Sequence, residues 1–221
     1  MSDPASGLKA QGEAFGLYLV LTDPVAGYTN CAEAAVRAGV RYIQLRMKQS
    51  PREEVLKTAL ALSSITWGSP TRFIVNDDPE LAVQAEADGV HLGQDDMPVD
   101  EARRRFGTLA CFGLSTHNEA QAKEARIIRP DYIGVGPIFA TPTKNIPDPT
   151  VGLERMGRII SLSPLACVAI GGIDADNLPA VLKAGAVNFA VVRAVCQSTK
   201  PYDAIRRLQD IRTRNTKKGP G

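Results

Sequence analysis

Short apolar runs alternate with longer amphipathic stretches along most of this chain. The apolar runs are rich in β-branched residues and are typical of strands buried on both faces. We predict strands at Leu17–Leu21, Tyr42–Leu45, Arg72–Val75, Gly89–His91, Ala110–Leu114, Asp131–Val135, Cys167–Ile170 and Phe189–Val192. The stretches between and after them predict helices at Asn30–Ala38, Pro51–Ile65, Pro79–Ala87, Val99–Phe106, Asn118–Arg129, Leu153–Leu162, Ala175–Ala184 and Tyr202–Arg212.

Several of these helices carry end signals. Ser50-Pro51 and Asp78-Pro79 read as an N-cap followed by a first-turn proline. Gly39 and Gly185 stand just past helix ends, where a left-handed C-terminal cap favours glycine.

The strand–helix alternation determines the fold class. Strands joined by helices through short connections predict a parallel sheet of the α/β class. Eight such units favour closure into a single (β/α)8 TIM barrel, and an open doubly wound sheet is the alternative. We place the barrel domain at residues 16–213, after a flexible N-terminal leader (1–15) and before a flexible basic C-terminal tail (214–221).

Composition narrows the function classes. The net charge of +2, with 23% charged residues, gives no support for nucleic-acid binding. The four cysteines form no CxxC pair and are expected to be buried free thiols of a reducing compartment. No apolar stretch approaches a membrane span and no signal peptide is evident. We therefore expect a soluble, cytoplasmic protein with no nucleic-acid or membrane partner.

In such a barrel the active site is built at the carboxyl ends of the strands. Gln44, Arg46 and Lys48 occupy alternate positions at the end of the second predicted strand. Period-two alternation places them on one side, where two cations and an amide could hold a phosphate or pyrophosphate. The alternative is a solvated strand end with ordinary surface charges.

Acidic pairs follow the next two strands, in Asn76-Asp77-Asp78 and in Gln94-Asp95-Asp96. One or two carboxylates together with waters and substrate phosphate are the usual ligands of Mg²⁺. We assign metal ligation to Asp77 and Asp96. Asp78 is interpreted as the cap of the following helix, and Asp95 or Asp96 could cap the helix near Pro98.

The fifth and sixth strands are followed by hydroxyl and cationic side chains. Ser115 could hydrogen-bond a substrate ring or simply begin a helix, and a Ser115–His117 hydrolase pair lacks an orienting acid. Thr141, Thr143 and Lys144 precede a proline-rich loop and offer a grip for phosphate.

The last two strands end in Gly171-Gly172 and in Val192-Arg193. Paired glycines let backbone N–H groups approach an anion, and loops after strands 7 and 8 often form a phosphate site. The rim therefore carries two anion sites, one suited to a monophosphate and the other to a pyrophosphate with Mg²⁺. This arrangement suits two phosphorylated small-molecule substrates or one bisphosphate.

The chain resembles the thiamine-phosphate synthase family from about Gly16 to Leu208. The motifs that carry the resemblance are Gln44-Leu45-Arg46-Met47-Lys48, Val75-Asn76-Asp77-Asp78, the segment 87–96 (Ala-Asp-Gly-Val-His-Leu-Gly-Gln-Asp-Asp), Gly134-Val135-Gly136-Pro137-Ile138-Phe139 with Thr141-Pro142-Thr143-Lys144, and Ala169-Ile170-Gly171-Gly172-Ile173.

The resemblance implies a transferase. It would join 4-amino-2-methyl-5-(diphosphooxymethyl)pyrimidine to 4-methyl-5-(2-phosphooxyethyl)thiazole, giving thiamine phosphate and pyrophosphate by a Mg²⁺-assisted dissociative displacement. The residues agree, because no clear nucleophile or strong base is present and the cations would stabilise a leaving group. The resemblance also suggests a homo-oligomer.

Roles follow by position from the same resemblance. Arg46, Lys48, Lys144 and Ser115 become catalytic residues, and Asp77 and Asp96 become the Mg²⁺ ligands. The pyrimidine-pyrophosphate grip comprises Gln44, Arg46, Lys48, Asn76 and Ser115; the strand-6 loop that contacts both substrates comprises Thr141, Thr143 and Lys144; and the thiazole-phosphate cradle comprises Gly172, Val192 and Arg193.

Two positions depart from the family pattern. Met47 replaces an acidic residue of many members but alternates away from the site, and Arg193 replaces a small hydroxyl residue of several members. Two alternatives are a thiazole tautomerase of the same superfamily, which should lack the metal carboxylates and the pyrophosphate grip, and a non-catalytic phosphate-binding barrel.

Overall fold

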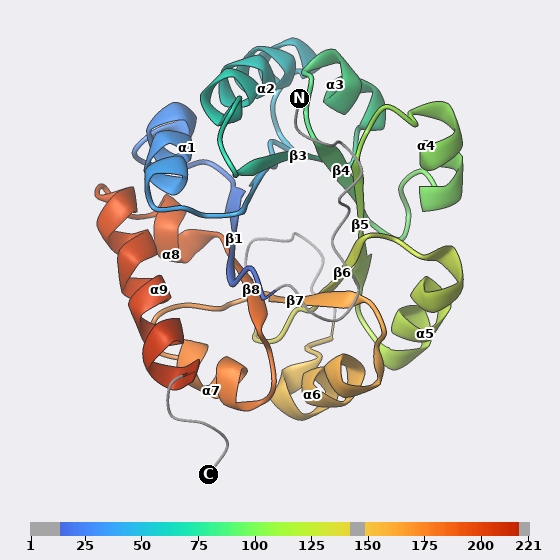
Figure 1. Ribbon diagram of the computed structural model, residues 1–221, viewed down its shortest axis with the longest axis vertical. Coiled ribbons are helices and arrows are strands. Elements are labelled where there is room, and N and C mark those ends of the chain that lie inside the picture. Colours follow the sequence, from blue (N-terminus) through green and yellow to red (C-terminus); the bar gives the residue numbers. More distant parts are fainter. Residues whose placement is uncertain (1–13, 142–148, 217–221) are drawn as a thin grey trace.

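The strands close into one parallel barrel surrounded by helices (Figure 1). The computed structural model describes residues 14–141 and 149–216. The strands are β1 (Leu17–Leu21), β2 (Tyr42–Leu45), β3 (Arg72–Asn76), β4 (Gly89–Leu92), β5 (Cys111–Thr116), β6 (Tyr132–Val135), β7 (Ala166–Ile170) and β8 (Asn188–Val191). The predicted TIM barrel is confirmed, and the predicted strand bounds match or differ by one or two residues.

Closure of the barrel depends on pairing between the first and last strands. Leu17 of β1 is in register with Phe189 of β8, and on its other edge Tyr18 is in register with Tyr42 of β2. Every pair around the ring is parallel. All eight carboxyl ends therefore open onto one rim, which is the geometric condition for the predicted site.

Strand alternation separates two apolar cores. In β1, Leu17, Leu19 and Leu21 belong to the large cluster between strands and helices, whereas Tyr18 and Val20 belong to a second cluster inside the barrel. The inner cluster also contains Tyr42, Ile74, Cys111, Tyr132, Val168 and Ala190. The inner layer thus contains three tyrosines, and each buried hydroxyl needs a hydrogen-bond partner there.

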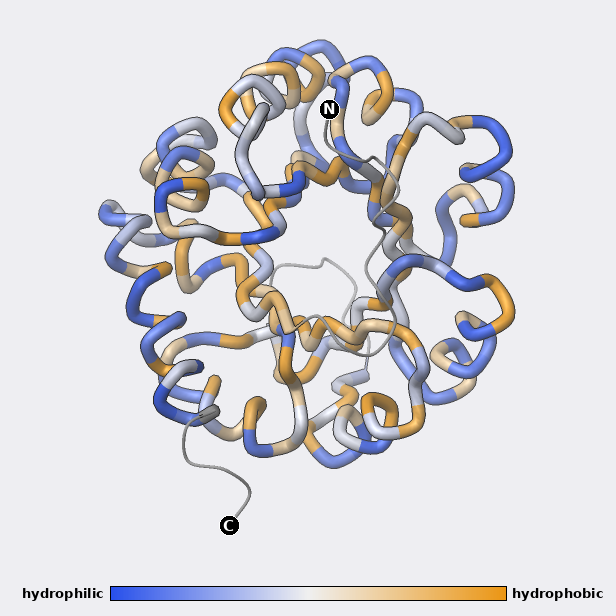
Figure 2. Tube along the Cα trace, viewed as in Figure 1, coloured by the Kyte–Doolittle hydropathy of each residue, from blue (hydrophilic) through white to orange (hydrophobic). Residues whose placement is uncertain are grey.

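The helices form the outer ring and place their hydrophilic residues outward (Figure 2). They are α1 (Tyr28–Arg37), α2 (Arg52–Thr66), α3 (Pro79–Gln84), α4 (Val99–Arg105), α5 (Glu119–Ile128), α6 (Gly152–Leu162), α7 (Leu178–Lys183), α8 (Arg193–Cys196) and α9 (Pro201–Thr216). The short α8 was not predicted. No helix within the described ranges is long and apolar enough to cross a bilayer.

Helix ends agree only partly with the sequence signals. Asp78 caps α3 by accepting the Leu81 N–H at 2.8 Å, as predicted. Gly39 and Gly185 have φ of 70° and 102°, the expected C-terminal conformation. The prediction for Ser50 was wrong, because Pro51 itself is the N-cap of α2 and makes no side-chain cap bond.

The described packing extends slightly beyond the predicted barrel domain at both ends. Phe15 lies with its ring centroid 4.7 Å from that of Tyr42, and α9 continues to Thr216. The domain boundaries remain a prediction, since most of the predicted leader and the end of the tail lie outside the described residues. The four cysteines are buried and free, as expected.

Close packing between β4 and β5 requires a glycine at position 89. A Cβ at this position would lie 2.1 Å from the Cys111 carbonyl oxygen. The clash would therefore be with the backbone of the neighbouring strand. Gly89→Ala is expected to lower the free energy of unfolding by about 3 kcal/mol, at the upper end for overpacking. Chemical denaturation measures the change.

Gly68→Ala is the control for this substitution. Gly68 has φ of 71° but nothing within 4 Å of a built Cβ, so only backbone strain of about 1 kcal/mol is expected. Equal destabilisation by the two variants would contradict the close strand packing at Gly89.

Candidate active site

The cationic strand end of β2 lies beside the acidic strand end of β3. β2 ends at Leu45, and the Arg46 N–H continues the ladder by donating to the Leu21 carbonyl at 3.0 Å. The Lys48 ammonium forms an ion pair with the Asp77 carboxylate. Arg46 is half-buried; burial lowers the pKa of its guanidinium, and the nearby Asp77 and Asp23 act in the opposite direction. The predicted anion grip and metal ligand are therefore neighbours.

Gln44 lies deeper than the two cations. Its side chain is 5% exposed inside the barrel, and its amide nitrogen donates to the Tyr18 hydroxyl at 3.0 Å. Lys48, by contrast, is exposed at the rim. The three alternating polar residues thus occupy different depths, with the amide at the floor and the ammonium at the mouth.

The two predicted metal ligands meet each other. Burial raises the pKa of the Asp96 carboxyl, and a hydrogen bond with Asp77 raises it further. The Gly93 N–H donates to the Asp96 carboxylate at 2.6 Å, and this bond lowers the pKa. Asp77 has a φ of 64°, a left-handed conformation that is uncommon outside glycine and often marks a functional constraint. Two adjacent carboxyl groups on one rim could together bind a cation, as the sequence predicts.

The alternative that Asp95 or Asp96 caps the next helix was wrong. The N-cap of α4 is Pro98, which makes no side-chain cap bond. Asp95 is exposed, and Asp96 turns back to the Gly93 N–H. Asp96 is therefore held toward Asp77 by its own loop.

Ser115 of β5 bonds to a histidine that the sequence did not single out. Its hydroxyl lies 2.9 Å from His91 Nε2, and its carbonyl accepts the Gln94 amide at 2.6 Å. His117 lies instead with Nδ1 at 2.7 Å from the Gly136 carbonyl. The Ser115–His117 pair considered from the sequence does not form. A polar residue at an inward position of β4 was the available signal for His91.

The loops after β6 and β7 pack on each other at the opposite part of the rim. The Phe139 N–H donates to the Gly171 carbonyl at 3.0 Å. Gly172 has a φ of 66°, and a Cβ there would lie 2.8 Å from Phe139 Cβ. Glycine is thus required for this close approach, whichever ligand the loop binds.

The remaining predicted residues are placed unevenly. Asn76 ends β3 in register with His91 and is partly buried, and Thr141 is also partly buried. Val192 precedes α8 and is partly buried, whereas Arg193 begins α8 and is exposed. Thr143 and Lys144 lie outside the described residues.

The cysteines offer no nucleophile near neutral pH. Burial raises the pKa of Cys167 to about 11 and that of Cys196 to about 12, and it raises the pKa of Cys31 and Cys111 as well. Because the thiolate is the reactive form, these thiols are inert structural groups.

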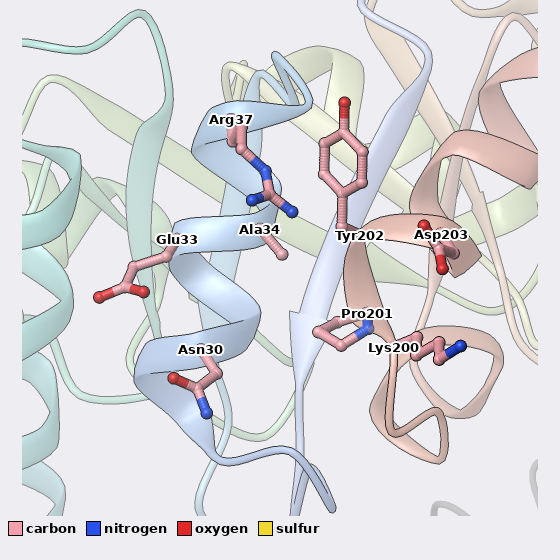
Figure 3. Close-up of a pocket in the computed structure, with 8 residues that line it drawn as sticks. All are labelled: Asn30, Glu33, Ala34, Arg37, Lys200, Pro201, Tyr202 and Asp203. Atoms are coloured by element: carbon pink, nitrogen blue, oxygen red, sulfur yellow. The ribbon is translucent and has the colours of Figure 1, made fainter.

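A surface pocket of about 510 Å³ lies on the outside of the barrel, between α1 and the start of α9 (Figure 3). None of the predicted site residues lines it. Its Arg37 guanidinium stacks 4.0 Å from the centroid of the Tyr202 ring, which joins the two helices. We interpret this pocket as a helix–helix junction.

Comparison with known proteins identifies the family of this chain. Residues 17–195 match the family model described as thiamine monophosphate synthase. The chain belongs to the thiamine monophosphate synthase family.

Individual relatives give the same family. A thiamine-phosphate synthase from Anaeromyxobacter dehalogenans is 41% identical over 88% of this chain and 86% of its own length. One from Gloeobacter violaceus is 43% identical over 88% of this chain, but the chain spans only 56% of that relative. The solved thiamine phosphate pyrophosphorylase from Pyrococcus furiosus has a TM-score of 0.83 at 30% identity, covering 91% of this chain and 97% of that one.

In this member of the family, the raised pKa of Asp96 gives a pH-dependent prediction. A carboxyl whose folded pKa is raised destabilises the fold as pH rises through that pKa. Without divalent cations, Asp96→Asn is therefore expected to raise the melting temperature at neutral pH, and the gain should shrink as the pH falls. Thermal unfolding in chelator across pH measures this.

Asp95→Asn, at the exposed neighbouring position, is the matched control and should show no such trend. A gain for Asp96→Asn that persists unchanged in acid would contradict the assigned origin of the shift.

Proposed function

We propose that the protein is a thiamine-phosphate synthase. It would condense 4-amino-2-methyl-5-(diphosphooxymethyl)pyrimidine with 4-methyl-5-(2-phosphooxyethyl)thiazole, giving thiamine phosphate and pyrophosphate. The observation that carries the proposal is the cluster of Arg46, Lys48, Asp77 and Asp96 on one rim, in a chain of this family. A thiazole tautomerase would need neither the cation pair nor the carboxyl pair.

The carboxyl pair fits Mg²⁺ as a cofactor. Asp77 and Asp96 present hard oxygen donors, and they lie close enough for a hydrogen bond between them to raise the pKa of Asp96. Within the described ranges no group of three or more His, Cys, Asp or Glu side chains could hold a metal. Two carboxylates with water and substrate phosphate suit Mg²⁺, which seldom takes an all-protein cage. When bound, Mg²⁺ would neutralise charge on the pyrophosphate.

The protein's own cations act on the leaving group. When the C–O bond to the pyrimidine methylene breaks, its electron pair goes to the pyrophosphate oxygen. Arg46 and Lys48 would stabilise that charge, and the half-buried position of Arg46 strengthens its effect. The thiazole nitrogen then donates its lone pair to the methylene carbon and forms the C–N bond. No protein nucleophile is required.

The other substrate would bind across the rim. We assign the thiazole phosphate to Gly172, Val192 and Arg193, with Thr141 between the two substrates. The tight Gly172–Phe139 packing shapes this part of the rim, and the exposed Arg193 could add charge. Thr143 and Lys144 keep their proposed contacts with both substrates. The homo-oligomer suggested by the resemblance also remains a prediction.

The role of the rim charges is tested by two substitutions. Arg46→Ala and Asp77→Asn are each expected to lower the turnover number by at least about 100-fold, since each removes electrostatic stabilisation of the leaving group. Asparagine tolerates the left-handed φ of Asp77, so the second variant changes charge without adding strain. Pyrophosphate release with both substrates measures turnover, and circular dichroism checks the fold.

Asp100→Asn on the exposed face of α4 is the control and should turn over like the native chain. Native rates in both rim variants would refute the assigned roles.

Mg²⁺ binding has its own readout. Mg²⁺ with pyrophosphate is expected to raise the melting temperature of the native chain, because a ligand that binds only the folded state stabilises it. The shift should be lost in Asp77→Asn and kept in Asp100→Asn. A full shift in Asp77→Asn would exclude Asp77 as a ligand.

A further inference from the structure

A continuous chain of hydrogen bonds crosses the interior of the barrel and joins two predicted substrate contacts. It runs from Gln44 through Tyr18, Tyr132 and His91 to Ser115. The four bonds are Gln44 Nε2–Tyr18 Oη at 3.0 Å, Tyr18 Oη–Tyr132 Oη at 2.8 Å, Tyr132 Oη–His91 Nδ1 at 3.0 Å and His91 Nε2–Ser115 Oγ at 2.9 Å. These residues come from five different strands or strand ends of the ring.

The two tyrosines in the middle of this chain of hydrogen bonds are closed to solvent. Tyr18 is 2% exposed and Tyr132 is 1% exposed. Burial raises the pKa of both hydroxyls, so each keeps its single proton at neutral pH. A buried hydroxyl with one proton must be a donor in only one of its hydrogen bonds, and the chain therefore has a direction.

The direction is determined at Gln44. Its amide nitrogen can only donate, so the Tyr18 oxygen accepts from it. Tyr18 then gives its proton to Tyr132, and Tyr132 gives its own to His91 Nδ1. In the opposite direction Tyr18 would accept twice, and its proton would have no acceptor among its described hydrogen bonds.

The direction of these hydrogen bonds determines the tautomer of His91. A histidine that accepts at Nδ1 carries its hydrogen on Nε2 in the neutral ring. His91 Nε2–H therefore donates to Ser115 Oγ, and the hydroxyl proton of Ser115 remains available to donate to another acceptor.

A glycine in β5, the strand between β4 and β6, leaves room for the bond between Tyr132 and His91. A Cβ at Gly113 of β5 would lie 2.3 Å from Tyr132 Cζ and 2.5 Å from His91 Nδ1. Any larger residue at this position would separate the hydroxyl from the ring. The glycine thus provides the space in which Tyr132 and His91 meet.

We propose that Tyr132 is a positioning residue that fixes the tautomer of His91 and so makes Ser115 a hydrogen-bond donor to the pyrimidine half of the substrate. The substrate part of this inference rests on the proposed function. Tyr132 itself touches no substrate. It acts through His91. At the other end of the hydrogen-bond chain, the amide nitrogen of Gln44 is held toward Tyr18.

The tautomer can be measured without substrate. The chain has 2 histidines, so the imidazole ¹⁵N spectrum contains only the rings of His91 and His117. At a pH where both rings are neutral, His91 is expected as the Nε2–H tautomer. His117 donates to the Gly136 carbonyl through Nδ1 and is expected as the opposite tautomer, which gives an internal reference.

Tyr132→Phe removes the donor and is expected to shift His91 away from a single tautomer, with His117 unchanged. Tyr42→Phe is the matched control. Tyr42 stacks 5.6 Å from Tyr18 in the same cluster, and its hydroxyl makes none of the four bonds. An Nδ1–H tautomer of His91 in the native chain would overturn the proposal, even if Tyr132→Phe does not fold.

Kinetics then test the consequence for Ser115. Tyr132→Phe is expected to lower kcat by about tenfold, the loss of one oriented hydrogen bond, with little change in KM for the thiazole phosphate. Tyr42→Phe should keep native values. Native kcat in Tyr132→Phe would overturn the inference, whereas an inactive native chain with the expected tautomers would instead refute the proposed function.

Discussion

Closure of the parallel barrel is the constraint on which the site depends. The pairing of β1 with β8 completes the ring, so that side chains distant in sequence reach one rim. Strand alternation then assigns each residue to one of two environments, the outer layer under the helices or the interior of the barrel. The charged side chains stand where the alternation ends, at the mouth. The inner layer beneath them is filled by tyrosines whose hydroxyls must be satisfied, and this need produces the polar chain from Gln44 to Ser115.

Charge is balanced at the rim by juxtaposition of unlike groups. The carboxyl groups of Asp77 and Asp96 are adjacent, and Lys48 forms an ion pair with Asp77. Arg46 is half-buried, with Asp77 and Asp23 nearby. Such an arrangement is poor as a structural feature, because adjacent carboxyl groups repel when ionised. It is useful for binding a cation together with a polyanion. The proposed function would account for this cost to stability at the rim.

The sequence was sufficient to predict the barrel and most of its rim. Apolar runs and glycine signals located every strand, and the order of strands placed Arg46, Asp77 and Asp96 on one edge. Local rules failed where a longer-range partner decided the outcome. Ser50 precedes a proline that is itself the cap, and Asp96 turns to Gly93 and Asp77 instead of capping α4.

The polar chain could not be predicted for a related reason. Tyr18, His91 and Tyr132 belong to strands far apart in sequence, and only the closed ring brings their polar atoms within 3.0 Å. Gly113 shows the same limit, since its small size matters only once Tyr132 and His91 lie opposite it. Alternation predicts the direction of a side chain, but its partner depends on the register of the whole barrel.

We propose above all that the rim joins two phosphorylated substrates with loss of pyrophosphate. The most direct measurement is product formation by the purified protein with the pyrimidine pyrophosphate, the thiazole phosphate and Mg²⁺, omitting each in turn. Thiamine phosphate and pyrophosphate are expected in equal amounts when all three are present, and no thiamine phosphate is expected when any one is omitted. Absence of thiamine phosphate from the complete mixture, with the protein folded, would contradict it.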